Sequence, residues 1–267
     1  MKKLIIIFSI FLLIDFSINS YDLSKSINEL NKLDEKYVIY VYDGDTFKLS
    51  SGETVRLVGI DTPEMNHNSN EKKEIFAEKA KKFTSNNLKN KKIYLEYGRK
   101  KYDKYNRLLA YVYKRSGEIF NLTLLEKGLA DLLFIPPNEK YSKTFYEAAK
   151  TAHKDEKGKW KIFNQKFWDK SVKRIDHTET GKFINKKVIV EGKIVNTHDT
   201  GKIIFLDFSK NYQKSFSIVI YKRPRFMFPF DPCEYFLNKN IAVSGKIIRY
   251  ENKYEIIVKN PFQIKIK

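Results

Sequence analysis

A meander of three short strands near the N-terminal end limits the possible folds of this chain most strongly. Tyr37–Tyr42 is rich in β-branched and aromatic residues, Thr46–Leu49 alternates, and Thr54–Ile60 forms a third run. The dipeptides Asp43-Gly44 and Ser51-Gly52, which separate these runs, are typical of tight turns. We therefore expect a small β-sheet here.

Further elements follow the meander up to about residue 168. The spacing of Phe76, Ala80, Phe83 and Leu88 predicts a helix over residues 71–88. Two more strands are predicted at 92–97 and 108–113, then a short helix at 119–127 and a longer one at 139–156, with Trp160 packed under it. Five strands with a helix inserted after the third indicate a small closed barrel of the OB type.

The C-terminal third of the sequence predicts five strands of its own. They are expected at residues 187–195, 203–208, 216–221, 241–250 and 253–258. The polar segment 171–180 is interpreted as a linker. The sequence thus predicts a mainly β protein with helices, of the α+β class, made of an OB-fold domain at 34–168 and a second OB-like barrel at 173–267.

The net charge of +19 indicates a polyanionic partner: nucleic acid, anionic membrane or acidic polysaccharide. A general drift of the sequence toward lysine and asparagine is the simpler explanation of part of this charge. Residues 172–267 carry +10 and residues 1–171 carry +9, so the shorter segment is the more densely positive. Its aromatic residues fit either a platform for stacking single-stranded bases or an ordinary core: Tyr212, Phe216, Tyr221, Phe226 and Phe228.

The first twenty residues have the pattern of a secretory signal peptide. Lys2 and Lys3 precede a short apolar run, and small polar residues close it near Ser20. The run is shorter than the roughly 20 residues of a membrane-spanning helix, so we favour a cleaved signal over an uncleaved anchor. The protein is therefore expected to be exported, to the periplasm or outside the cell. With Cys233 as its one cysteine it has no internal disulfide, and it shows no Cys/His metal spacing.

Acidic and arginine side chains gather at the ends of the predicted strands. Asp45 and Asp61 offer oxygen ligands that suit Ca²⁺ or Mg²⁺ better than Zn²⁺. Glu64 is close enough to Asp61 to act as a general base, and two arginines, Arg56 and Arg107, could hold a phosphate. Each feature alone also has a structural explanation, such as Asp61 and Glu64 forming a helix capping box.

Four motifs in order make this region resemble the staphylococcal nuclease (thermonuclease) family. They are DGDTFKL at 43–49, VRLVGIDTPE at 55–64, DKYNRLLAYVY at 103–113 and EKGLA at 126–130. The resemblance covers residues 37–160. It implies an OB-fold barrel with a Ca²⁺-dependent phosphodiesterase site that leaves a 3′-phosphate and a free 5′-hydroxyl on DNA and RNA.

The resemblance also implies a role for each matching residue. The metal ligands are Asp45, Asp61 and the backbone carbonyl of Thr62, with Asp43 beside them. The catalytic residues are Arg56, Glu64 and Arg107, of which the arginines bind the phosphate and Glu64 is the general base. The substrate-binding residues are Lys104, Tyr105 and Phe134. Phe134 and Pro136 stand where the family's type member has two tyrosines that line the nucleotide pocket, which leaves substrate preference open.

We therefore expect a secreted Ca²⁺-dependent endonuclease that hydrolyses DNA, RNA or both, as a monomer without a protein partner. The C-terminal domain is expected to hold the nucleic acid and raise processivity. The main alternative is a non-catalytic nucleic-acid-binding protein made of two OB barrels. A third possibility is a basic protein that binds anionic lipid or polysaccharide.

Overall fold

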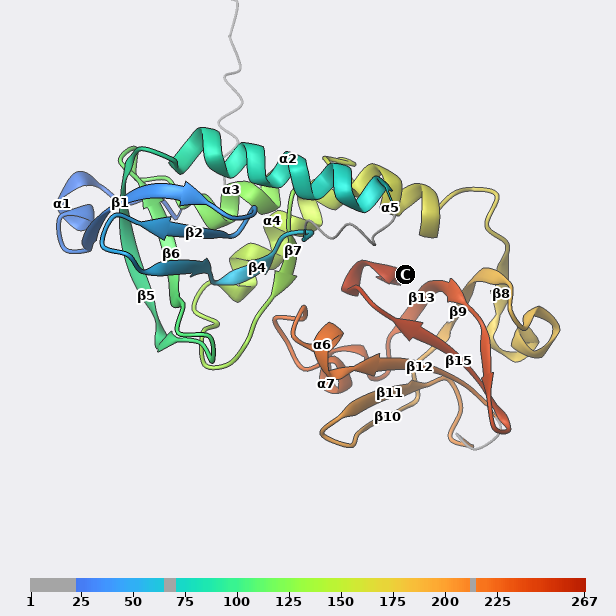
Figure 1. The fold of residues 1–267 in the computed structure, drawn as a ribbon. Helices are drawn as coiled ribbons and strands as arrows, with labels where there is room; N and C mark the ends of the chain where they lie inside the picture. The colour runs from blue at the N-terminus through green and yellow to red at the C-terminus, as the bar shows by residue number, and fades with distance from the viewer. Residues whose placement is uncertain (1–22, 65–70, 212–214) are drawn as a thin grey trace, which may run out of the picture.

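The computed structural model describes residues 23–64, 71–211 and 215–267 (Figure 1). The predicted signal peptide at 1–20 and the aromatic residue Tyr212 lie outside these residues. Within the described part of the chain, no helix has both the length and the apolar character that crossing a membrane requires.

The N-terminal strands close into the predicted barrel, in the order β1-β2-β3-β6-β5. The strands are β1 (Asp34–Val41), β2 (Thr46–Leu49), β3 (Thr54–Leu57), β5 (Lys92–Tyr102) and β6 (Leu108–Lys114). The pair β3–β6 is parallel, and the other neighbours are antiparallel. The prediction of a mixed α+β fold with a five-stranded barrel is confirmed. We call residues 23–168 the barrel region.

The third predicted strand is in fact two strands, because the chain turns out of the barrel at Val58. Beyond the turn, β4 (Gly59–Asp61) pairs with β7 (Asp131–Leu133) in a separate ribbon. Gly59 has a φ of +81°, and a Cβ atom there would lie 2.8 Å from the ring of Phe145, so both conformation and space require glycine. The buried amide of Asn121 fixes the turn by donating to the carbonyl of Val58 at 2.9 Å. This turn directs Asp61 away from the barrel wall.

Helices pack around the barrel and also hold its turns. They are α1 (Ile27–Leu30), α2 (Glu71–Leu88), α3 (Phe120–Glu126), α4 (Ser142–Lys154) and α5 (Trp160–Phe167). The bounds of α2 match the prediction, whereas α1 and α5 were not predicted. Trp160 is fully buried, as expected, but it begins a helix of its own. Thr84 of α2 donates to the carbonyl of Gly44 at 2.6 Å and so ties the Asp43-Gly44 turn to this helix.

The C-terminal region, residues 172–267, consists of two sheets around a separate apolar core. The sheets have the orders β10-β11-β12-β15-β14 and β16-β13-β9-β8. The strands are β8 (Arg174–Asp176), β9 (Lys187–Lys193), β10 (Asn196–Asp199), β11 (Ile203–Asp207), β12 (Phe216–Tyr221), β13 (Asn240–Lys246), β14 (Ile248–Tyr250), β15 (Lys253–Val258) and β16 (Ile264–Ile266). The helices are η1 (His177–Phe183), α6 (Lys222–Arg225), α7 (Pro232–Phe236) and η3 (Pro261–Gln263).

The strand pairing of this region follows that of the first barrel when β9–β10 and β13–β14 are each counted as one bent strand. The pairs β10–β11 and β11–β12 are antiparallel, β12–β15 is parallel, and β15–β14 and β13–β9 are antiparallel. The barrel region has the same sequence of pair directions. Each of the five predicted segments contains a strand, but the predicted strand 241–250 is divided into β13 and β14. β10 and the two edge strands β8 and β16 were not predicted. The segment 171–180 is not an unstructured linker, because β8 pairs with β9 and Ile175 enters the core.

The suggested stacking platform of the C-terminal region is largely core. Phe216 and Phe228 are 1% and 5% exposed, and Phe226 is half-buried. Of the four suggested aromatics that the structure describes, Tyr221 alone is exposed. The strand β12 is buried on both faces from Phe216 to Ile220, and the ring of Phe216 belongs with Ile218 and Ile220 to the core between the two sheets.

Aromatic side chains join the two regions. The ring of Phe262 in η3 stacks on His153 of α4 at 4.8 Å and meets Trp160 edge-on at 5.1 Å. The indole N–H of Trp168 donates to the carbonyl of Phe262 at 2.8 Å. The rings of Tyr146 in α4 and Phe230 also meet edge to face, with their centres 5.6 Å apart. The C-terminal region therefore packs on α4 and α5 through an apolar contact.

Because His153 is buried, we expect the free energy of unfolding to fall on acidification. Burial lowers the pKa of His153 from 6.5 to about 4, and the nearby Lys265 adds to the effect. Because the unfolded chain then binds the proton more tightly, stability should fall as the pH drops from about 6.5 toward 4, by at most roughly 3 kcal/mol. Urea titrations at several pH values should show this fall, and His153→Phe should make it shallower. Parallel curves for the two proteins would contradict the assignment.

Candidate active site

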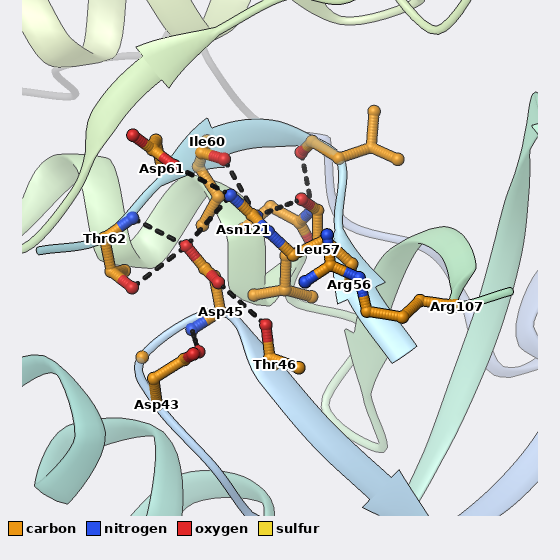
Figure 2. A network of polar contacts seen from close by, with 12 residues as sticks. Asp43, Asp45, Thr46, Arg56, Leu57, Ile60, Asp61, Thr62, Arg107 and Asn121 are labelled. Carbon is orange, nitrogen blue, oxygen red and sulfur yellow. Dashed lines mark hydrogen bonds and ion pairs between the residues drawn. The ribbon is translucent and has the colours of Figure 1, made fainter. Parts of the chain in front are cut away.

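A single cavity of about 580 Å³ brings together all but one of the site residues predicted from the sequence. Its lining includes the predicted metal ligands Asp45, Asp61 and Thr62, the neighbouring Asp43, the predicted catalytic residues Arg56, Glu64 and Arg107, and the predicted substrate contacts Lys104 and Tyr105. These residues come from the β1–β2 turn, from β3, from β4 and the segment after it, and from the β5–β6 loop. Figure 2 shows the polar network at their centre.

Asp45 lies at the base of the network and is 4% exposed. Its Oδ2 accepts hydrogen bonds from the backbone N–H of Thr62 at 2.6 Å and from the Thr62 hydroxyl at 2.9 Å, while Oδ1 accepts one from Thr46 (Figure 2). Burial raises the pKa of Asp45 above its ordinary value, and the charge of Arg56 opposes this shift. The carboxyl is thus fixed in place before any ligand arrives.

The turn that carries Asp45 needs a glycine at position 44. A Cβ atom at Gly44 would lie 2.7 Å from both Thr62 and Ala80. The absence of a side chain lets the turn approach Thr62 closely enough for the two hydrogen bonds to Asp45. Asp43 stabilises the same turn by accepting the backbone N–H of Asp45 at 3.1 Å.

Arg56 connects the two predicted metal ligands. Its Nη2 lies 3.2 Å from Oδ2 of Asp45 and 3.0 Å from Oδ1 of Asp61. Its Nη1 donates to the backbone carbonyls of Leu57 and Ile60, on either side of the turn into β4. The turn at Val58 therefore brings two carboxylates to one positively charged atom.

This arrangement fits a hard cation in its donor chemistry. Asp45 and Asp61 offer only oxygen atoms and already converge on one cationic nitrogen, so a cation could bind both. Among the residues that the structure describes, no group of three or more His, Cys, Asp or Glu side chains could hold a metal. A Ca²⁺ ion takes about 6–8 oxygen ligands, so most would have to come from the backbone, water or substrate.

Asp103 positions the second arginine and was not predicted. Its Oδ2 accepts Nε–H of Arg107 at 2.7 Å, and its Oδ1 accepts the backbone N–H groups of Tyr105 and Arg107. Burial alone would raise the pKa of Asp103, but the hydrogen bonds from Arg107 and Tyr105 outweigh it and lower the pKa. The carboxylate therefore stays charged and directs Arg107 toward the Arg56 network (Figure 2).

The predicted substrate contacts on the β5–β6 loop are accessible. Tyr105 is 67% exposed, with Nζ of Lys104 at 4.8 Å from the centre of its ring and Cζ of Arg107 at 5.4 Å. Glu64, at the end of the first described segment, is also exposed. An exposed ring beside two cations suits contact with a nucleotide.

Phe134 is the predicted site residue that the structure does not bring to the cavity. Its ring is 1% exposed and belongs to the barrel core. The alternation that begins in β7 points Leu132 and Phe134 to the core, whereas Leu133 and Ile135 line the cavity. A buried ring cannot stack on a base, so the prediction of Phe134 as a substrate contact is wrong, whereas Pro136 does line the cavity.

Arg223 is a second residue that the sequence did not indicate. It comes from α6 in the C-terminal region, and its Nη2 lies 2.6 Å from Oδ2 of Asp61. Its position depends on how the C-terminal region packs on the barrel region, which no local sequence pattern predicts. Asp103, in contrast, precedes Arg107 by four residues in a turn, which is a recognisable local signal.

Comparison with known proteins agrees with this geometry. The sequence profile of the family described as Staphylococcal nuclease homologue matches residues 54–162. A thermonuclease of Staphylococcus intermedius is 41% identical over 130 residues, which are 47% of this chain and 76% of that protein. A thermonuclease of Staphylococcus hyicus is 38% identical over 140 residues, or 51% of this chain and 82% of the relative.

An endonuclease of Bacillus subtilis (strain 168), YncB, is also similar. It is 36% identical over 123 residues, which are 44% of this chain and 57% of the relative. The residues matched by the family profile span β3, the Arg107 loop and α4. They therefore include most of the cavity lining, but not the turn residues Asp43, Asp45 and Thr46 and not Arg223.

Proposed function

Because the chain belongs to the staphylococcal nuclease family, we propose that it is an exported, Ca²⁺-dependent endonuclease that cleaves DNA, RNA or both to 3′-phosphate products. Its relatives support the broader assignment, a nuclease that hydrolyses phosphodiester bonds. The observation that carries the proposal is the composition of the cavity. The carboxylates of Asp45 and Asp61 both pair with the guanidinium of Arg56, and the exposed carboxylate of Glu64 and the guanidinium of Arg107 line the same cavity.

Each side chain has a proposed part in the reaction. Asp45 and Asp61, with the carbonyl of Thr62, would hold Ca²⁺, which when bound supplies positive charge beside the phosphate. Arg56 and Arg107 donate hydrogen bonds to phosphate oxygens and stabilise the negative charge that develops on them.

Glu64 completes the proposed reaction as the general base. It accepts a proton from the water that attacks phosphorus; the bond to the 5′ oxygen breaks, and this oxygen takes up a proton from solvent to become the 5′-hydroxyl. The exposure of its carboxylate at the cavity wall supports access to a water molecule.

The C-terminal region has a proposed part in holding the polymer. Its net charge of +10 favours a nucleic-acid backbone. The strand pairing it shares with the first barrel agrees with an OB-like module, a fold that binds oligonucleotides. Export rests on the signal-like segment at 1–20.

A nuclease assay tests the proposal directly. The purified protein is incubated with single-stranded DNA, double-stranded DNA and RNA, each with Ca²⁺ or with a chelator. We expect cleavage in Ca²⁺ and none in chelator, with product ends that carry a 3′-phosphate. Cleavage in chelator, or 5′-phosphate ends, would contradict the mechanism, and tight binding without any cleavage would favour the non-catalytic alternative.

A further inference from the structure

Arg223 belongs to the C-terminal region but lies in the active-site cavity. Among the described residues that line the cavity it is the one that follows position 138 in the sequence. It reaches across 162 positions to pair with Asp61 at 2.6 Å. The carboxylate of Asp61 therefore carries a guanidinium on each oxygen, Arg56 on Oδ1 and Arg223 on Oδ2.

The helix that carries Arg223 is fixed against the barrel region. The backbone N–H of Phe134 donates to the carbonyl of Phe226 at 2.5 Å, and Met227 is buried in the barrel core. On the other side, Arg225 pairs with Asp199 of β10. In Figure 1, α6 and α7 lie on the side of the C-terminal region that faces β4 and β7. The contacts of these neighbouring residues therefore hold Arg223 at the edge of the site, independently of its ion pair with Asp61.

The guanidinium itself remains available to a ligand. The side chain of Arg223 is 67% exposed, compared with 12% for Arg56. An ion pair with so exposed a guanidinium contributes little to stability. Guanidinium groups bind phosphate through two parallel N–H···O bonds, which a single carboxylate oxygen does not satisfy.

A second cavity, of about 630 Å³, adjoins the first at Arg223. Both cavities are lined by Asp61, Thr62, Glu64 and Arg223. Beyond these shared residues the second cavity has basic and aromatic side chains of α5, among them Lys166 and Phe163. A polynucleotide strand that enters the first cavity could continue past Arg223 into the second.

We propose that Arg223 is a third phosphate-binding arginine of this site, which contacts a phosphate next to the one that is cleaved. The contact lies where the strand passes from the first cavity into the second. This inference rests on the proposed function and extends it, because it makes the C-terminal region a direct contributor to substrate binding. Arg223 then favours substrates longer than a dinucleotide.

Binding in chelator tests the contact without cleavage. Kd is measured by fluorescence anisotropy for a labelled 12-nucleotide single-stranded DNA, and by competition for a dinucleotide with one phosphodiester. Arg223→Ala should raise Kd for the 12-mer about tenfold and leave the dinucleotide unaffected. The salt dependence of log Kd should become shallower by about 0.7, the value for one phosphate contact on a single strand.

Lys222→Ala is the matched control, since it removes an exposed positive charge from the same helix but outside both cavities. It should change both Kd values little, and Arg223→Lys should lie between the wild type and Arg223→Ala. Equal effects of the two alanine variants, or tighter binding by Arg223→Ala, would overturn the inference. If the wild type neither binds the 12-mer nor cleaves DNA or RNA in Ca²⁺, the proposed function fails as well. If the wild type cleaves in Ca²⁺ while Arg223→Ala binds the 12-mer as the wild type does, the inference alone fails.

Discussion

Replacing Arg107 with alanine should lower kcat by about 10²–10³-fold, the usual cost of removing one preorganised donor from a developing oxyanion. Arg107 lines the cavity together with Arg56, and in Figure 2 its side chain extends toward the Arg56 network. Asp103 holds its Nε–H and leaves the other guanidinium N–H groups for a ligand. The rate is measured with saturating single-stranded DNA in Ca²⁺, so that weaker binding does not hide the effect on the reaction.

Two further variants show whether Arg107 acts through its charge at the site. Arg115→Ala removes an exposed arginine from the turn after β6, and it should cleave at the wild-type rate. Asp103→Asn keeps an acceptor for the backbone N–H groups but weakens the charged hydrogen bond to Arg107, so a loss of about tenfold is expected. If kcat of Arg107→Ala stays within a few-fold of kcat of Arg115→Ala, the proposed role of Arg107 in stabilising the phosphate is wrong.

Local patterns in the sequence predicted most of the fold because the elements of the barrel are locally determined. The helix α2 has apolar residues at near-helical spacing from Phe76 to Leu88, and β2 lies between two turns that contain glycine. The turn at Val58 was missed because its causes are distant. It requires the amide of Asn121 from α3 and a pairing partner from β7. A run of alternating residues cannot reveal where a strand leaves its sheet.

Among the site residues, too, local patterns predicted those in short motifs, and distant contacts determine the others. The carboxylates and arginines lie within three short motifs, and the barrel brings those motifs to one cavity. Phe134 was misplaced because position along the chain does not decide the direction of a side chain, which the alternation beginning in β7 sets. Arg223 could not be predicted, since its place depends on the packing of η3 and of α6 with the residues that follow it against the barrel region.

Replacing Glu64 with glutamine should lower kcat by about 10²–10⁴-fold, the range that general base catalysis contributes. Glutamine keeps the size and polarity of the side chain but cannot accept the proton of the attacking water. Because Glu64 is exposed, its replacement should leave the fold intact, which a thermal melt of the variant checks. Single-turnover cleavage of a short DNA in Ca²⁺ isolates the chemical step.

Glu78→Gln is the matched control for this test, because it removes the same charge from the exposed face of α2. If Glu64 acts through the general electrostatic field, the two variants should behave alike, because each changes the net charge by one. If Glu64 accepts a proton in the reaction, its variant alone should lose turnover while its Kd for DNA in chelator stays near that of the wild type. Equal single-turnover rates for the two variants would assign the base to another group, and the carboxylates Asp45 and Asp61, which are tied to Arg56, are poorly placed to replace it.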